Sequence, residues 1–397
     1  MSDADELGFL PDRLQRISDH IQSNYLDNGK LPFASLLIGR GDDVALSWSS
    51  GVADDAIFRI ASMTKPVTSV AFMQLVEQGK VALTDPVAKY IPEFAKLGVF
   101  VAGGGNIPFV SRPPTTPMRI IDVLRHTTGF TYSFQERSNV DAAYRKTDVE
   151  SWTKNSSQSF IDTLAQIPLE FDPGTQWNYS VSTDVLGVLV ERISGQSLPD
   201  YFGEHIFGPL GMTDTFFTVP ADKASRIPQC FAFDPVTKMK LFDETGDKSL
   251  WTKGWSFNSG GGGLASSVAD YHRFCRMLLN GGALDGVQII SPKTLELMTA
   301  NHLPGGQDLT QMSKSLFSEA EMAGIGFGFG FAITIDSTAT LTPCSTGDFY
   351  WGGMYSTAFF VDPVEDIIMI FMTQLMPSST YPVRREIKTM IYSALAA

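Results

Sequence analysis

Short apolar runs of strand length lie at both ends of this chain, and the long segment between them has the patterns of helices and loops. Near the N-terminus, "PFASLLIGRGDDVALSWSSGVAD" (residues 32–54) gives two apolar runs around "RGDD", which predict a β-hairpin. Three more strands are predicted in "GFGFGFAITID" (326–336), "DFYWGGMYSTAFFVDP" (348–363) and "DIIMIFMTQLM" (366–376). The most economical topology is one sheet built from both termini, with the middle of the chain inserted as a separate region.

The spacing of apolar residues predicts helices at 62–79, 118–126, 157–166, 181–194 and 197–206, and two more near the termini at 10–28 and 381–396. Two segments, 100–117 and 303–322, are longer than ordinary connections and are predicted to be loops that can line a site. We therefore expect an α/β (α+β) fold. In it, residues 1–60 and 255–397 form an α/β domain with an antiparallel sheet flanked by helices. Residues 61–254 form a mainly helical domain, with a cleft between the two.

The composition excludes several classes of protein. Hydrophobic residues make up 43% and charged residues 18% of the 397 residues. No apolar run approaches the roughly 18 residues of a membrane span, so none is expected. The net charge of −13 would repel phosphate backbones, so nucleic acid is not an expected partner. The acidic, amphipathic start lacks the pattern of a secretory signal, which predicts a cytoplasmic protein. The three cysteines are widely spaced and no metal-binding motif occurs, so no disulfide, metal or cofactor is expected.

A serine and a lysine three residues apart begin the most apolar of the predicted helices, in "ASMTKPVTSVAFMQL" (61–75). Pro66 has no backbone N–H for the carbonyl four residues earlier, so it belongs in the first turn and places Ser62 at the helix N-terminus. Side chains at i and i+3 share a face, so the Lys65 amine can reach the Ser62 hydroxyl. Burial among apolar neighbours lowers the pKa of a lysine toward the range in which the neutral amine accepts a proton. The pair therefore predicts an activated serine nucleophile.

Other interpretations stay open from the residues alone. The Ser-x-x-Lys pattern also arises by chance, and its second copy, Ser151 and Lys154 in "SWTKNSSQS", lies in a polar segment and is predicted at the surface. A Ser-His-Asp hydrolase is the natural competitor, but no GxSxG occurs and the five histidines are scattered. His126 in "RHTTGF" is interpreted as part of a helix C-terminus that Gly129 caps. The run "SGGGGLASSVAD" (259–270) predicts close packing or a tight turn, because no GK[ST] follows it.

Several segments occur in the order found in one known superfamily. Besides "SMTK" they are "VLRHTTGF" (123–130), "PGTQWNYSVSTDVLGVLVERISG" (173–195), "HIFGPLGMTDTFF" (205–217), "GGGGLASSVADYHRF" (260–274) and "WGGMYSTAFFVDP" (351–363). Together they resemble the serine β-lactamase and penicillin-binding-protein superfamily, in particular the family VIII carboxylesterases related to class C β-lactamases. The resemblance covers most of the chain and implies a β-lactamase/transpeptidase-like fold.

The resemblance also implies a set of site residues. Ser62 is expected to be the nucleophile, Lys65 its activating partner, and Tyr179 in "NYS" the tyrosine of the second motif. Trp351, Gly352 and Gly353 stand where β-lactamases have Lys-Thr-Gly and are assigned to substrate binding. The backbone N–H groups of Ser62 and Met354 are expected to form the oxyanion hole. Lys65 and Tyr179 are expected to share one proton and to titrate as a coupled pair.

Two departures from the β-lactamase pattern favour esters. Trp351 replaces a lysine that helps to hold the substrate carboxylate, and Val181 replaces the asparagine of the second motif. The expected function is hydrolysis of short-chain carboxylic esters through a Ser62 acyl-enzyme, with a small-molecule ester as the partner. The alternatives are a β-lactamase, a D-alanyl-D-alanine peptidase or an acyltransferase on the same fold, and a non-catalytic binding module. Tyr132, Phe134 and Tyr355 are predicted as walls of the substrate pocket, and no oligomeric state is predicted.

Overall fold

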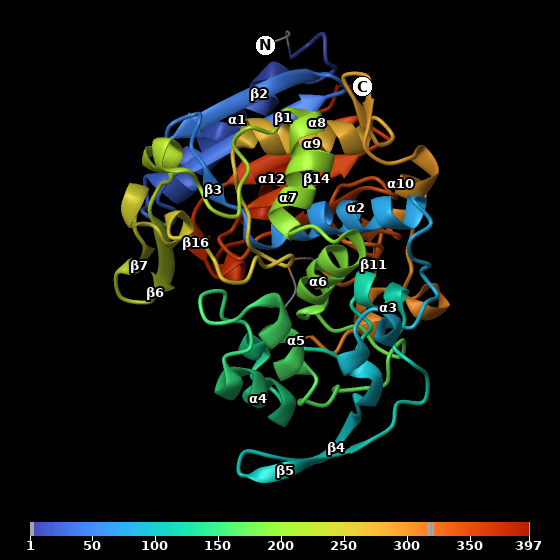
Figure 1. Cartoon of the computed structure of the whole chain (residues 1–397). Coiled ribbons are helices and arrows are strands. Elements are labelled where there is room, and N and C mark those ends of the chain that lie inside the picture. The colour runs from blue at the N-terminus through green and yellow to red at the C-terminus, as the bar shows by residue number, and fades with distance from the viewer. Residues whose placement is uncertain (1–3, 316–318, 320, 397) are drawn as a thin grey trace.

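The computed structural model describes residues 4–315, 319 and 321–396 (Figure 1). Its centre is a seven-stranded sheet in the order β11-β12-β13-β14-β15-β1-β2, with every neighbouring pair antiparallel. The strands come from the two ends of the chain: β1 (Ala34–Arg40), β2 (Asp43–Ser50), β11 (Ile325–Phe327), β12 (Ala332–Thr334), β13 (Phe349–Gly352), β14 (Ala358–Asp362) and β15 (Ile367–Met372). Because β15 pairs with β1, one sheet unites both termini. The predicted fold class is confirmed.

Twelve α-helices occur in the described part of the chain. They are α1 (Pro11–Ile21), α2 (Thr64–Glu77), α3 (Ile120–Leu124), α4 (Asn139–Thr147), α5 (Ser157–Leu164), α6 (Ser182–Ser194), α7 (Leu198–Phe202), α8 (Gly208–Leu210), α9 (Val268–Leu279), α10 (Pro292–Met298), α11 (Leu309–Met312) and α12 (Val383–Ser393). All seven helices predicted from the sequence are present, most of them a few residues shorter than expected. Within this part of the chain, no helix has the length and apolar character to cross a membrane.

Helices cover both faces of the sheet, because its central strands are apolar on both sides (Figure 1). On one face, α1 and α12 pack against side chains such as Leu36 and Phe371. On the other face, α9 packs against β15, and Leu37 and Ile370 join a larger core that continues through α2 and α6. Successive strand residues point to opposite faces, so one sheet supports two cores. The larger core encloses α2, and the 3-10 turn that precedes this helix (Ala61–Met63) contacts β13.

The inserted region carries hairpins that were not predicted. Residues 100–117, predicted as a loop, contain most of a hairpin of β4 (Val99–Gly104) and β5 (Ile107–Arg112). That prediction was wrong because most side chains of this hairpin are exposed, so no buried stripe marks it. A second hairpin joins β6 (Cys230–Asp234) and β7 (Lys238–Asp243), and β16 (Leu375–Met376) adds to it in parallel. The remaining short strands form two pairs, β3 (Phe58–Arg59) with β8 (Ala265–Ser266) and β9 (Ala283–Leu284) with β10 (Val287–Gln288).

Two of the segments that were each predicted as one strand near the C-terminus are hairpins of two strands. The sheet therefore has seven strands where five were predicted. The segment 326–336 turns between β11 and β12 at Gly330, whose φ is +91°, and a Cβ there would lie 2.4 Å from the Ser69 hydroxyl oxygen. Gly330 therefore packs against α2, whereas Gly326 and Gly328 pack against Asn301 and the backbone of Met298. The segment 348–363 turns between β13 and β14, where Ser356 has a φ of +67°. A single apolar run thus concealed a turn in each case.

Candidate active site

A cavity of about 500 Å³ lies beside the N-terminus of α2. Its lining comes from segments that are far apart in the sequence, including Ser62 before α2, Tyr179 before α6, Gly261 before α9 and Met354 after β13. The cavity therefore brings together Ser62, Tyr179 and Met354, three of the residues that the sequence singled out.

Ser62 lies in a single 3-10 turn (Ala61–Met63) that leads directly into α2. The preceding residue, Ala61, has a φ of +43°, a left-handed conformation that is strained for a residue with a Cβ and that recurs at functional sites. Lys65 Nζ lies 3.1 Å from Ser62 Oγ, and the Tyr179 hydroxyl donates to the same oxygen at 2.6 Å. Two groups that can carry a proton therefore meet at one serine hydroxyl.

Lys65 is almost completely enclosed, with 1% of its surface exposed. Burial lowers the pKa of its amine to about 8, although the negative charges of Asp184, Glu319 and Glu150 oppose the shift. Its Nζ donates to the carbonyl oxygen of Gly261 at 2.6 Å and lies 4.7 Å from the centre of the Tyr179 ring. The amine is thus fixed beside Ser62, and a substantial neutral fraction exists near pH 8.

The run of four glycines at residues 260–263 allows the Gly261 carbonyl oxygen to lie 2.6 Å from Lys65 Nζ. A Cβ on Gly261 would lie 2.6 Å from a carboxylate oxygen of Asp184, and one on Gly260 would lie 2.8 Å from the carbonyl oxygen of Thr183. The Thr68 hydroxyl of α2 donates to the Gly260 carbonyl at 2.7 Å. The run is therefore packed between α2 and α6, which confirms the predicted close packing.

Tyr179 is buried just before α6, and burial raises the pKa of its phenol well above the usual value. The ring of His126 packs against it with ring centres 5.5 Å apart. The two nitrogens of His126 contact the hydroxyls of Ser180 at 3.2 Å and Thr183 at 3.3 Å. Burial lowers the pKa of His126 well below its usual value, so this histidine is a neutral support for the tyrosine ring. The predicted cap at Gly129 was wrong: α3 ends at Leu124, and His126, with a φ of +57°, takes the left-handed position after the helix.

The turn after β13 places Met354 at the cavity, within the same lining as Ser62. Gly353 packs on the turn that carries Ser62, since a Cβ there would lie 2.3 Å from the carbonyl oxygen of Ile60. Among the described residues, the backbone N–H of Met354 has no hydrogen-bond acceptor. A backbone donor without a partner among the described residues therefore belongs to a lining residue of the cavity, and its role in the oxyanion hole stays a prediction.

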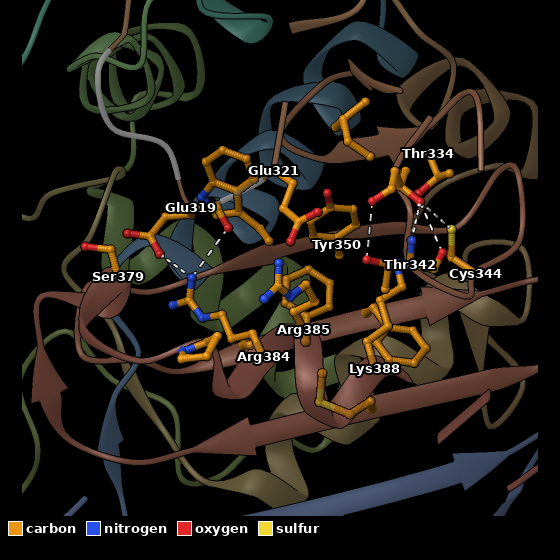
Figure 2. A pocket seen from close by; sticks show the side chains of 18 of the residues that line it. Glu319, Glu321, Thr334, Thr342, Cys344, Tyr350, Ser379, Arg384, Arg385 and Lys388 are labelled. Carbon is orange, nitrogen blue, oxygen red and sulfur yellow. Dashed lines mark hydrogen bonds and ion pairs between the residues drawn. The ribbon is translucent and has the colours of Figure 1, made fainter. Parts of the chain in front are cut away.

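Arg384 of α12 forms hydrogen bonds with the backbone of this turn. Its guanidinium donates to the carbonyl oxygens of Gly353 at 2.6 Å and Thr357 at 2.7 Å. It also donates to the Glu319 carboxylate at 2.7 Å (Figure 2). A Cβ on Gly352 would lie 2.6 Å from the same guanidinium. Packing therefore requires glycine at both positions of the third motif.

Trp351 is 1% exposed and supports Tyr179 from the side, with ring centres 5.4 Å apart. It borders a second cavity of about 410 Å³, which adjoins the first because Glu319 and Ser379 line both (Figure 2). Neither Trp351 nor the two glycines is among the described residues that line the cavity at Ser62. Their predicted contact with substrate stays a prediction. Val181 is fully buried at the start of α6.

Two of the three predicted pocket walls line the cavity. Tyr132 and Phe134 are stacked with ring centres 4.9 Å apart and belong to the lining. Tyr355 does not, and that prediction was wrong. The turn at Ser356 directs its ring into a separate apolar cluster, where it lies 6.1 Å from the Trp251 ring.

Three carboxylates line the same cavity and were not predicted: Glu150, Asp184 and Glu319. Burial raises the pKa of Glu150 to about 7 and also raises that of Asp184. Asp184 accepts hydrogen bonds from the Ser259 hydroxyl and the Gly261 N–H. A charged residue within the apolar α6 was a signal for Asp184. The sequence held no signal for Glu150, which arrives from the segment between α4 and α5.

The second Ser-x-x-Lys copy lies at the surface, as predicted. The Lys154 side chain is 73% exposed and pairs with Asp148 at 2.6 Å. The described residues contain no group of three or more histidine, cysteine, aspartate or glutamate side chains placed to hold a metal ion.

The fold and this site define a serine hydrolase with a β-lactamase/transpeptidase-like architecture. The model of the family described as Beta-lactamase matches residues 19–389, and the chain belongs to that family. It is 36% identical over 323 residues to Protein Rv1367c of Mycobacterium tuberculosis, and the aligned residues cover 81% of this chain and 78% of that protein. It is 27% identical over 380 residues to Esterase EstB of Burkholderia gladioli, and the aligned residues cover 89% of each protein.

A solved structure shares the fold. EstCE1, described as a hydrolase with promiscuous acyltransferase activity, superposes with a TM-score of 0.78 at 23% identity and covers 96% of this chain and 99% of that chain.

Proposed function

We propose that this protein hydrolyses short-chain carboxylic esters that carry no negative charge, through an acyl-enzyme on Ser62. The observation that carries the proposal is the approach of both Lys65 Nζ and the Tyr179 hydroxyl to Ser62 Oγ at the wall of a cavity. The narrower assignment to the family VIII carboxylesterases rests on Trp351 and Val181, and the similarity to Esterase EstB supports it.

In the first half of the reaction, neutral Lys65 accepts the proton of Ser62 as Oγ bonds to the ester carbonyl carbon. The carbonyl oxygen becomes an oxyanion, which the N–H groups of Ser62 and Met354 stabilise. When the intermediate collapses, the bond to the alcohol breaks and the alcohol oxygen takes a proton from the Tyr179 hydroxyl. The Lys65 ammonium then returns a proton to Tyr179, so the pair ends neutral.

In the second half, water replaces the alcohol. The pair accepts a proton from water as its oxygen attacks the acyl carbon, and Ser62 Oγ leaves with a proton. The raised pKa of Tyr179 supports this division of roles, since a phenol that keeps its proton is a donor and the amine of Lys65 is the base.

The charge of the cavity argues against the β-lactam and D-alanyl peptide alternatives. Among the described residues that line it there is no lysine, arginine or histidine, whereas three carboxylates are present. A substrate carboxylate would therefore enter without a partner and against like charges. An acyltransferase would use the same acyl-enzyme with an alcohol in place of water, as the description of EstCE1 suggests for that protein.

The test is a comparison of initial rates on p-nitrophenyl butyrate and a chromogenic cephalosporin, for wild type and Ser62→Ala. We expect ester hydrolysis that is lost in the variant and little turnover of the cephalosporin. Rapid cephalosporin turnover would contradict the ester preference, and ester hydrolysis that survives in Ser62→Ala would contradict the nucleophile. Added methanol separates the acyltransferase alternative, because that function would give methyl butyrate as the main product.

A further inference from the structure

The cavity beside Ser62 is built to attract positive charge. Glu150, Asp184 and Glu319 reach it from three separate segments of the chain. Two of these carboxylates have partners within the protein, since Glu319 pairs with Arg384 and Asp184 accepts from Ser259 and Gly261. Glu150 accepts only from the backbone N–H of Ser133 at 2.6 Å and its hydroxyl at 3.1 Å among the described residues. No cation in the described part of the chain forms an ion pair with Glu150.

The rest of the lining is largely aromatic. Tyr132 and Phe134 are stacked on one side, and Phe160 and Phe257 form a second stacked pair with ring centres 4.7 Å apart. Trp152 adds an indole to the same wall. Aromatic faces attract ammonium groups through the negative charge of their π-systems, and the attraction grows where water is excluded. Aromatic walls with an unneutralised carboxylate form a suitable environment for an organic cation.

Lys65 does not cancel this charge. It contacts the Ser62 hydroxyl, is enclosed by protein and is not among the described residues that line the cavity. Its Nζ lies 5.4 Å from the centre of the Tyr132 ring, and its charge interacts with Asp184, Glu319 and Glu150. Among the described residues it forms no ion pair within 4 Å with any of these carboxylates. At pH 8 about half of the Lys65 amines are neutral, so Lys65 offsets only part of the negative charge of the three carboxylates.

We propose that the preferred substrates are esters that carry a protonated amine or a quaternary ammonium group, which Glu150 and the surrounding aromatic rings recognise. This inference rests on the proposed esterase function and names its substrate class. Glu150 acts in it as a specificity-determining residue, and the ester bond is broken by the same Ser62 chemistry.

The test uses pairs of esters that differ only in charge. Butyrylcholine is compared with 3,3-dimethylbutyl butyrate, in which a carbon replaces the ammonium nitrogen. The p-nitrophenyl ester of 4-(trimethylammonio)butyrate is compared with that of 5,5-dimethylhexanoate, which places the charge on the acyl side. The ratio of kcat/KM within each pair is measured at pH 8 for wild type, for Glu150→Gln and for Glu296→Gln. Glu296 is a glutamate on the surface of α10 and serves as the control.

We expect a ratio of roughly tenfold or more in favour of the cation in at least one pair, because attraction to a carboxylate and to aromatic faces acts only on the charged ester. Glu150→Gln should bring that ratio close to one, while Glu296→Gln should keep it. Ratios of one or less in both pairs of wild type, or a preference unchanged in Glu150→Gln, would overturn the inference.

The two proposals fail in different ways. Hydrolysis of the neutral esters without a preference for the cations overturns only the inference on substrate class. Absence of hydrolysis for all four esters and for p-nitrophenyl butyrate overturns both.

Discussion

The protonation of Lys65 gives the sharpest quantitative expectation. Burial lowers the pKa of its amine from 10.5 to about 8, which corresponds to about 3 kcal/mol of lost preference for the charged form. If neutral Lys65 is the base, the active fraction is about one hundredth at pH 6, about one tenth at pH 7 and about nine tenths at pH 9. The rate should therefore rise about tenfold between pH 6 and pH 7 and level off above pH 8.5.

The assay measures kcat/KM for p-nitrophenyl butyrate from pH 6 to pH 9, followed at the wavelength where p-nitrophenol and its anion absorb equally. The rate with Ser62→Ala is subtracted to remove spontaneous hydrolysis. Glu150 titrates in the same cavity at about pH 7, so the profile is repeated with Glu150→Gln, in which only the Lys65 transition should remain. Lys154→Met removes the surface copy of the motif and should leave the profile unchanged. A profile that is flat between pH 6 and pH 8, or that falls with pH, would refute the assignment of Lys65 as the base.

Three further changes test the surroundings of the nucleophile. Tyr179→Phe removes the proton donor, so kcat should fall by about 10² to 10⁴ with little change in melting temperature. Near-normal turnover would exclude proton transfer through Tyr179. Gly353→Ala places a Cβ 2.3 Å from the Ile60 carbonyl oxygen and displaces the N–H of Met354. We expect kcat to fall about 10² to 10³ while the far-UV circular dichroism spectrum stays unchanged. Full activity would argue against this oxyanion hole. Arg59→Met leaves Asp243 buried without its ion-pair partner and should lower the free energy of unfolding in urea by about 3 to 5 kcal/mol; a loss below about 1 kcal/mol would contradict the value assigned to this pair.

Features with a strong periodic or positional signal could be predicted from the sequence. The apolar runs at both termini predicted the united sheet, since their lengths and turn residues leave few other topologies. The i, i+3 spacing of Ser62 and Lys65 predicted their contact, and Pro66 predicted where the helix begins. The resemblance to a known superfamily added Tyr179, which no local pattern connects to Ser62.

Features that depend on tertiary contacts could not be predicted. Glu150 is one glutamate among many in the sequence, and only the packing of the segment between α4 and α5 brings it to the cavity. The turn at Ser356 is concealed within one apolar run, so the burial of Tyr355 in a separate apolar cluster had no sequence signal. The β4–β5 hairpin buries little apolar surface and resembles a loop in its composition.

The most direct test of the account is covalent labelling of the nucleophile. Wild-type protein is treated with diethyl p-nitrophenyl phosphate, an ester analogue that leaves a stable phosphoryl group on an activated serine, and the modified peptide is identified by mass spectrometry. We expect one label per chain on Ser62, with loss of esterase activity in proportion to labelling, and no label in Ser62→Ala. A label on another residue that accompanies the loss of activity would contradict the assignment of Ser62 as the nucleophile, as would full activity after Ser62 is labelled.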